Sequence, residues 1–115
     1  MRTILTALAA LMLFAAPVVA GDFEDGVAAY KAGDNQKAFR LWKSLAEQGD
    51  AGAQFNLGLT YATGQGVPEN NVKAYVWISL ATVQGDEDAK GDMGIVKKMM
   101  TREKIAKGQE LAAKY

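Results

Sequence analysis

The chain has 115 residues, with 13 basic and 13 acidic side chains, and it contains neither cysteine nor histidine. A formal net charge of zero leaves no basic excess for phosphate binding, so we expect no nucleic-acid partner. The missing cysteines exclude a disulfide framework. Without histidine or cysteine, most nucleophilic and transition-metal sites cannot be built, so we expect no cofactor, no metal and no catalytic residue.

The first twenty residues have the pattern of a secretory signal peptide. Arg2 supplies a positive start, Ile4 to Ala16 is an almost wholly apolar run, and Pro17 interrupts it before Ala20. This order predicts cleavage after Ala20. The apolar run is shorter than the roughly 20 residues that cross a bilayer, so a retained anchor is the less favoured alternative. We expect an exported protein, periplasmic or secreted, with a single domain over residues 21–115 and no membrane span.

Two helices are predicted directly after this segment. The first runs from Phe23 to Ala32, with Asp22 as its cap and Gly33 at its end. The second runs from its predicted cap Asn35 to about Gln48. Apolar residues in the second helix recur at i, i+3, i+4, i+7 and i+8, which predicts one buried stripe and a solvated charged face. The stripe consists of Ala38, Leu41, Trp42, Leu45 and Ala46.

A third helix follows a Gly49-Asp50 turn, with Asp50 as its predicted cap, and ends in a glycine-rich loop. Its residues Ala53, Leu57 and Tyr61 fall on one face, and Gly58 is small where a neighbouring helix must approach closely. The loop from Thr63 to Asn71 lacks the Lys-Ser/Thr of a phosphate-binding loop and does not follow a strand. It therefore predicts a structural turn. Its conformation-setting residues are Gly64, Gly66 and Pro68, with Asn71 as the next cap.

The rest of the chain predicts three more helices. Val72 to Gln84 is apolar nearly all round, which indicates the central helix of the domain. Asp86 is expected to cap the next helix, and its acidic neighbours complement the helix dipole better than they form a calcium site. Thr101 is expected to cap a last helix from Arg102 to about Lys114. We expect four of its residues to pack inward: Ile105, Leu111, Ala112 and Tyr115.

Part of the chain repeats with a period of 36 residues. The segment from Ala38 to Gly58 returns at Ala74 to Gly94, including the Gln-Gly-Asp turn at 48–50 and again at 84–86. A fixed period in the thirties, built from helix–turn–helix units, indicates an α-solenoid.

The stretch from Ala53 to Pro68 resembles a Sel1-like repeat, a tetratricopeptide-like unit. The resemblance implies an all-α fold: an α-solenoid of about two to two and a half helix–turn–helix repeats plus a C-terminal capping helix. The units would cover about 23–50, 51–86 and 87–100, and the capping helix about 102–114. The repeat-structure residues are Ala53, Leu57, Gly58, Tyr61, Gly64, Gly66, Pro68, Ala74, Trp77 and Gly85.

The same resemblance implies a binding function. In tetratricopeptide-type stacks the first helix of each pair lines the concave face, which places Phe55 and Leu59 there, with Ile95 and Lys98 from the next unit. We expect a non-catalytic scaffold or adaptor that binds a protein or peptide on this face. The alternative for Phe55 and Leu59 is a place in the core.

Two other functions stay open. The first is a self-assembling structural subunit, because so few repeats could stack across chains. The second is a carboxylate-based cell-wall hydrolase, which requires a cleft with two converging acidic side chains.

Overall fold

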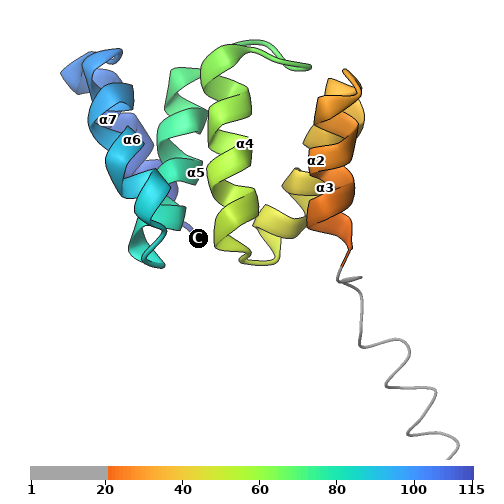
Figure 1. The fold of residues 1–115 in the computed structure, drawn as a ribbon. Helices are drawn as coiled ribbons and strands as arrows, with labels where there is room; N and C mark the ends of the chain where they lie inside the picture. Colours follow the sequence, from red (N-terminus) through yellow and green to blue (C-terminus); the bar gives the residue numbers. More distant parts are fainter. Residues whose placement is uncertain (1–20) are drawn as a thin grey trace, which may run out of the picture.

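A computed structural model describes residues 21–115, and the predicted signal peptide lies outside the described residues. The described part contains six helices and no strand, which confirms the all-α prediction. Figure 1 shows α2, α4 and α6 side by side in one layer, with α3, α5 and α7 in a second layer behind them. The helices are α2 (Asp22–Lys31), α3 (Asn35–Glu47), α4 (Ala51–Thr63), α5 (Asn71–Val83), α6 (Glu87–Lys98) and α7 (Arg102–Ala112).

Three predicted helix caps are confirmed. The Asp50 carboxylate accepts a hydrogen bond from the Ala53 N–H at 2.8 Å, and Asp86 does the same for Ala89 at 2.9 Å. The Thr101 hydroxyl accepts from the Lys104 N–H at 3.2 Å. Each bond satisfies one of the backbone donors that the first turn of a helix leaves unpaired.

Three other predicted caps are wrong by one residue. Asp34, not Asn35, caps α3, and Asn70, not Asn71, caps α5. In both cases the backbone N–H of the true cap bonds back to an earlier helix, from Asp34 to Ala29 O and from Asn70 to Tyr61 O, each at 2.8 Å. These bonds fix where the chain leaves the turn. The first helix begins at Asp22 itself, after Gly21, with no side-chain cap.

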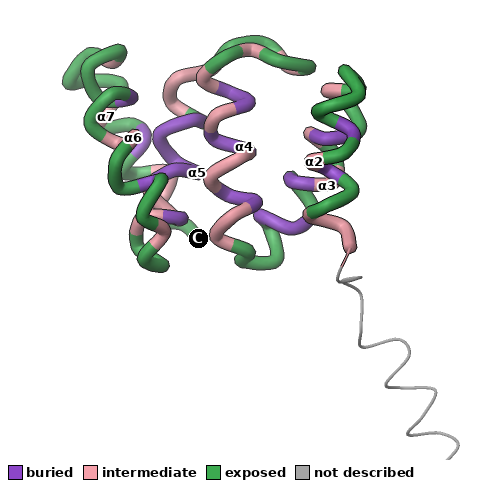
Figure 2. Tube along the Cα trace, viewed as in Figure 1, coloured by how far each residue is buried: buried purple, intermediate pink, exposed green. Residues whose placement is uncertain are grey.

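Helix α5 is the central helix, as predicted, because it packs against α4, α6 and α7. Figure 2 shows buried residues concentrated along α4 and α5, with exposed residues on the outer helices. One core cluster joins α2, α3, α4 and α5 around Trp42 and Leu57. A second joins α5, α6 and α7 around Tyr75 and Ile78.

The close approach predicted at Gly58 is confirmed. A Cβ atom added there would lie 2.5 Å from Cγ1 of Ile78 and 3.1 Å from the carbonyl oxygen of Ala74. Only glycine therefore allows α4 and α5 to lie at this distance.

The last helix packs against α5. Gly108 lies on the ring of Tyr75, where an added Cβ would be 2.5 Å from Cδ1. Ile105, Leu111 and Ala112 are partly buried, as expected for the inner side of this helix. Tyr115 is a correction, because 70% of its surface is exposed. It follows the end of α7, and its ring lies beside that of Trp77, at a centroid distance of 5.1 Å.

From residue 21 onward, none of the helices combines the length and the apolar character needed to cross a bilayer.

Candidate partner-binding face

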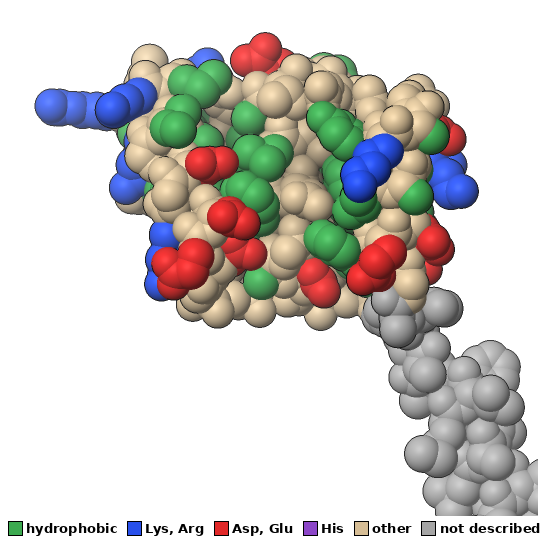
Figure 3. Space-filling model, in the orientation of Figure 1, with side chains coloured by type: hydrophobic (Ala, Val, Ile, Leu, Met, Phe, Trp, Pro, Cys, Tyr) green, Lys and Arg blue, Asp and Glu red, His purple; other side chains and the backbone are tan. Residues whose placement is uncertain are grey.

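An open apolar groove separates α2 from α4 on the layer formed by the first helices. Its volume is about 340 Å³. Figure 3 shows apolar side chains gathered over this hollowed face. The groove is lined by Val27, Tyr30, Trp42, Asn56, Leu59, Thr60, Thr63 and Gln65.

Two aromatic residues and one glycine give the groove its shape. The Trp42 indole, from α3, occupies the position that a side chain of Gly26 would need, so α2 can lie directly against it. Tyr30 leans over the same indole, with ring centroids 6.0 Å apart and planes tilted by 40°. Trp42 is buried, whereas 45% of the Tyr30 surface is exposed. The groove therefore has a fixed aromatic floor and an accessible aromatic edge.

The polar residues of the groove divide into two kinds. Two hydroxyls are used by α4 itself, since Thr60 donates to Asn56 O at 2.8 Å and Thr63 donates to Leu59 O at 2.9 Å. The side-chain amides of Asn56 and Gln65 make no hydrogen bond within residues 21–115. An amide can both donate and accept, so these two groups can bond to the backbone of a bound segment.

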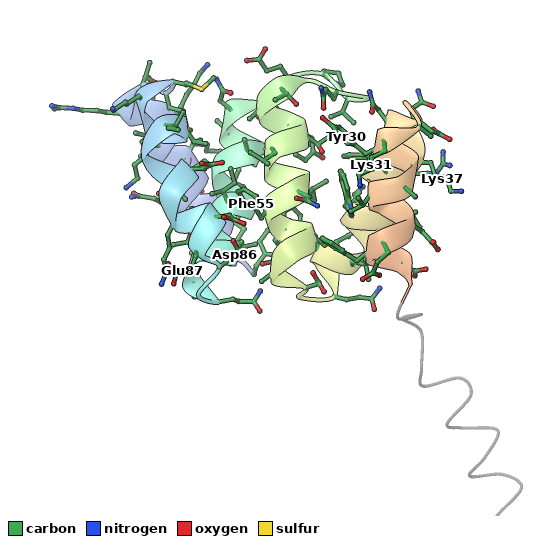
Figure 4. All side chains as sticks on the ribbon, in the orientation of Figure 1. Tyr30, Lys31, Lys37, Phe55, Asp86 and Glu87 are labelled. Carbon is green, nitrogen blue, oxygen red and sulfur yellow. The ribbon has the colours of Figure 1, made fainter. Side chains whose placement is uncertain are left out.

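The four residues predicted from the repeat pattern lie in different environments. Phe55 and Leu59 are half-buried and pack against the cluster around Tyr75 and Ile78. Leu59 also lines the groove. Figure 4 shows Phe55 on the α6 side of α4, across that helix from Tyr30.

The two predicted residues from α6 are more exposed. Ile95 exposes 58% of its surface, and it follows Leu59 by one repeat period. Lys98 is also exposed, and it follows Ala62 by one period. The structure therefore brings Leu59 together with residues that the repeat pattern did not select: Val27, Tyr30 and Trp42. The sequence signal that could have indicated the groove was Tyr30, an aromatic residue in a helix for which no buried stripe was predicted.

The two layers carry opposite charge. The first helices contain six carboxylates and four basic side chains, whereas the second helices contain three carboxylates and seven basic side chains. The red carboxylates in Figure 3 follow the lower edge of the first layer, at the N-terminal ends of its helices. Asp86 and Glu87, labelled in Figure 4, belong to this edge.

None of five grooves in residues 21–115 brings two acidic side chains together. Four grooves contain an acidic residue, and each holds a single one: Glu47 lines three of them, and Glu69, in the loop before α5, lines the fourth. No group of three or more potential metal ligands occurs among residues 21–115.

Comparison with known proteins identifies related repeats. The Sel1 repeat family matches residues 23–50 and 51–86. A similar protein from Rhizobium meliloti (strain 1021), named exopolysaccharide production negative regulator, is 36% identical over 72 residues. A protein of the same name from Rhizobium leguminosarum bv. viciae is 33% identical over 72 residues. Each alignment covers 63% of this chain and 27% of the relative, so the chain spans about a quarter of the length of these curated relatives.

Proposed function

Because the chain belongs to the Sel1 repeat family, we propose that it is an exported, non-catalytic adaptor that binds a protein or peptide segment along α2, α4 and α6. Sel1 repeats are protein–protein interaction modules, and the family is generally non-catalytic. The single observation that best supports this proposal is the open apolar groove between α2 and α4. Export is supported by the charge and apolar pattern of residues 1–20.

The groove offers a bound peptide segment both an apolar contact surface and a hydrogen-bonding side chain. An apolar side chain of the partner fills the space above Trp42 and against Tyr30, which excludes water from both. The Asn56 amide then bonds to the backbone of the same segment. Leu59 lines the groove and packs, like Phe55, on the cluster that α5 shares with α6. The proposed contact therefore extends toward the exposed Ile95 and Lys98 of α6.

The names of the relatives favour a regulatory role for this binding. Both are called negative regulators of exopolysaccharide production. A repeat protein without a catalytic pair acts in such a role by holding another protein. We extend this role to the present chain through its aligned repeats, although each relative is about four times longer than the aligned part.

The experiment is in-cell photo-crosslinking with a probe at Tyr30. Tyr30 is aromatic and exposed, so a benzophenone side chain replaces it without disturbing the core. A probe at Lys37, exposed on α3 and not part of the groove, is the matched control. We expect one recurrent adduct from Tyr30, absent from Lys37, and lost when Asn56→Lys places a charge in the groove.

Three results would contradict the proposal. Equal adducts from both positions would show non-specific contact. Self-adducts alone would favour the structural-subunit alternative. An adduct that persists with Asn56→Lys, in a protein of unchanged helicity, would show that the partner does not use this groove.

A further inference from the structure

A second groove of about 340 Å³ lies on the opposite layer, between α3 and α5. The end of α7 and the residues after it close one side. It is lined by Lys43, Glu47, Tyr61, Lys73, Val76, Trp77, Leu111, Lys114 and Tyr115. This is the layer in which basic side chains outnumber carboxylates. Nothing in the adaptor function described above uses this groove.

Tyr61 forms the floor of this second groove. It comes from α4, and only 8% of its surface is exposed. Its ring meets Phe39 edge-on at 5.7 Å, and Nζ of Lys73 lies 5.4 Å from its centre. Burial, Tyr115 and Glu47 raise the pKa of the Tyr61 hydroxyl, so it stays protonated at neutral pH. Tyr61 lines the groove, and no hydrogen bond within residues 21–115 uses its hydroxyl, so the hydroxyl is free to bond to a ligand.

Three lysines line the same groove, and none of them forms an ion pair within residues 21–115. Lys43 extends from α3, Lys73 from α5, and Lys114 follows α7. The two ion pairs of the described chain involve other residues, Lys90 with Glu87 and Lys107 with Glu110. Glu47 is the one acidic side chain in the lining, against the ammonium groups of three lysines, so the side chains of the groove carry a positive net charge. This charge favours an anionic ligand, held by charge-assisted hydrogen bonds.

The aromatic and apolar residues of the lining indicate the uncharged part of the ligand. Trp77 and Tyr115 form a tilted aromatic pair, and Val76 and Leu111 add apolar surface. Such walls suit a ring with an apolar face. A plain aromatic acid offers Glu47 no hydrogen-bond donor, whereas ring hydroxyls can donate to its carboxylate. A cyclic ligand with both a carboxylate and hydroxyls therefore matches the groove better than an aromatic acid or a neutral sugar.

We propose that the groove between α3 and α5 binds a sugar acid, a pyranose ring that carries a carboxylate. The carboxylate lies among Lys43, Lys73 and Lys114, and the Tyr61 hydroxyl donates to it or to a ring oxygen. Glu47 accepts from ring hydroxyls, and the apolar face of the ring packs against the Trp77–Tyr115 pair.

The test is a titration of the isotope-labelled protein with galacturonic acid, followed by backbone and indole NMR signals. We expect saturable shifts around Tyr61, Trp77 and Lys73, with a dissociation constant on the order of 1 mM for an open single-ring site. Galactose has the same ring without the carboxylate, and benzoate has a carboxylate without hydroxyls. Each should bind about tenfold more weakly, because each leaves one set of polar groups in the groove unpaired.

Two variants locate the site. Lys73→Gln removes one ammonium from an exposed position and should weaken galacturonate binding by about fivefold. Lys37→Gln removes an equal charge from α3 outside the groove and should leave the affinity unchanged. The proposal is overturned if galactose or benzoate binds as well as galacturonate, if the two variants behave alike, or if the shifts appear around Tyr30 instead. A failure here leaves the crosslinking result at Tyr30 unaffected.

Discussion

At the scale of single residues, two glycines in equivalent repeat positions have opposite structural roles. Gly58 lies against Ile78, whereas Gly94, one period later, has no atom within 4 Å of an added Cβ. Gly58→Ala should destabilise the protein by about 1–3 kcal/mol because fully buried Ile78 cannot move away. Gly94→Ala should stabilise it by about 0.5–1 kcal/mol through helix propensity. Urea unfolding of both variants measures the difference, and equal effects would contradict the packing shown at Gly58.

Tyr61 gives the protein a specific pH dependence. Burial, Tyr115 and Glu47 raise its folded-state pKa above the ordinary value of 10.0. As pH rises through about 10, the unfolded chain loses this proton first, so the folded state binds more protons and its free energy of unfolding falls. Tyr61→Phe keeps the ring but not the hydroxyl. We therefore expect a smaller loss of stability in this variant between about pH 9 and pH 10.5, measured by urea unfolding. Identical slopes in both proteins would disprove this role.

At the scale of the helical elements, one side chain joins the first two repeat units. Gln84 donates from Nε2 to Gly49 O at 2.9 Å and to Gln54 Oε1 at 2.8 Å. Gln54 is buried and in turn donates to Ala46 O at 3.2 Å. Gln84 thus links the end of α5 to the turn between α3 and α4.

Gln84→Ala should therefore cost about 1–2 kcal/mol, because it leaves the buried Gln54 oxygen without its donor. Gln48 is the equivalent residue one period earlier, but it donates only to Ser44 of its own helix. Gln48→Ala should change the free energy of unfolding by no more than about 0.5 kcal/mol. Chemical denaturation of the two variants compares them directly, and a larger effect for Gln48→Ala would refute the proposed link.

Helix positions were predictable from the sequence, because cap residues and apolar periodicity are local signals. Where two cap-forming residues follow each other, as at Asp34-Asn35 and Asn70-Asn71, the choice depends on backbone bonds to earlier helices. Those bonds have no local signature. The groove was less predictable for the same reason, since Trp42 reaches it from α3 through the space left by Gly26. A periodic pattern identifies Trp42 as apolar but not as the floor between two other helices.

At the scale of the whole molecule, the C-terminal repeat replaces inward-facing residues by lysine. Tyr61 and Ala62 of α4 correspond to Lys97 and Lys98 of α6, and buried Gln54 corresponds to Lys90. All three lysines are exposed. In α4 the residues Tyr61 and Gln54 pack against the second-layer helices α3 and α5. A copy docked over the corresponding side of α6 would have to bury ammonium groups, which costs several kcal/mol unless each finds a partner. The lysines therefore disfavour association through this side of α6, as expected for the polar outer face of a terminal repeat.

We expect the protein to be monomeric for this reason, with a molar mass by light scattering that does not change with concentration. The double variant Lys97→Tyr, Lys98→Ala restores the residues of the preceding repeat and removes both charges. It should associate as concentration rises, because an apolar helix face is then exposed at the end of the stack. Lys104→Ala, an exposed lysine on α7, is the control and should stay monomeric. A concentration-dependent mass in the unaltered protein would instead favour the self-assembling subunit, and would require an interface other than the lysine-bearing side of α6.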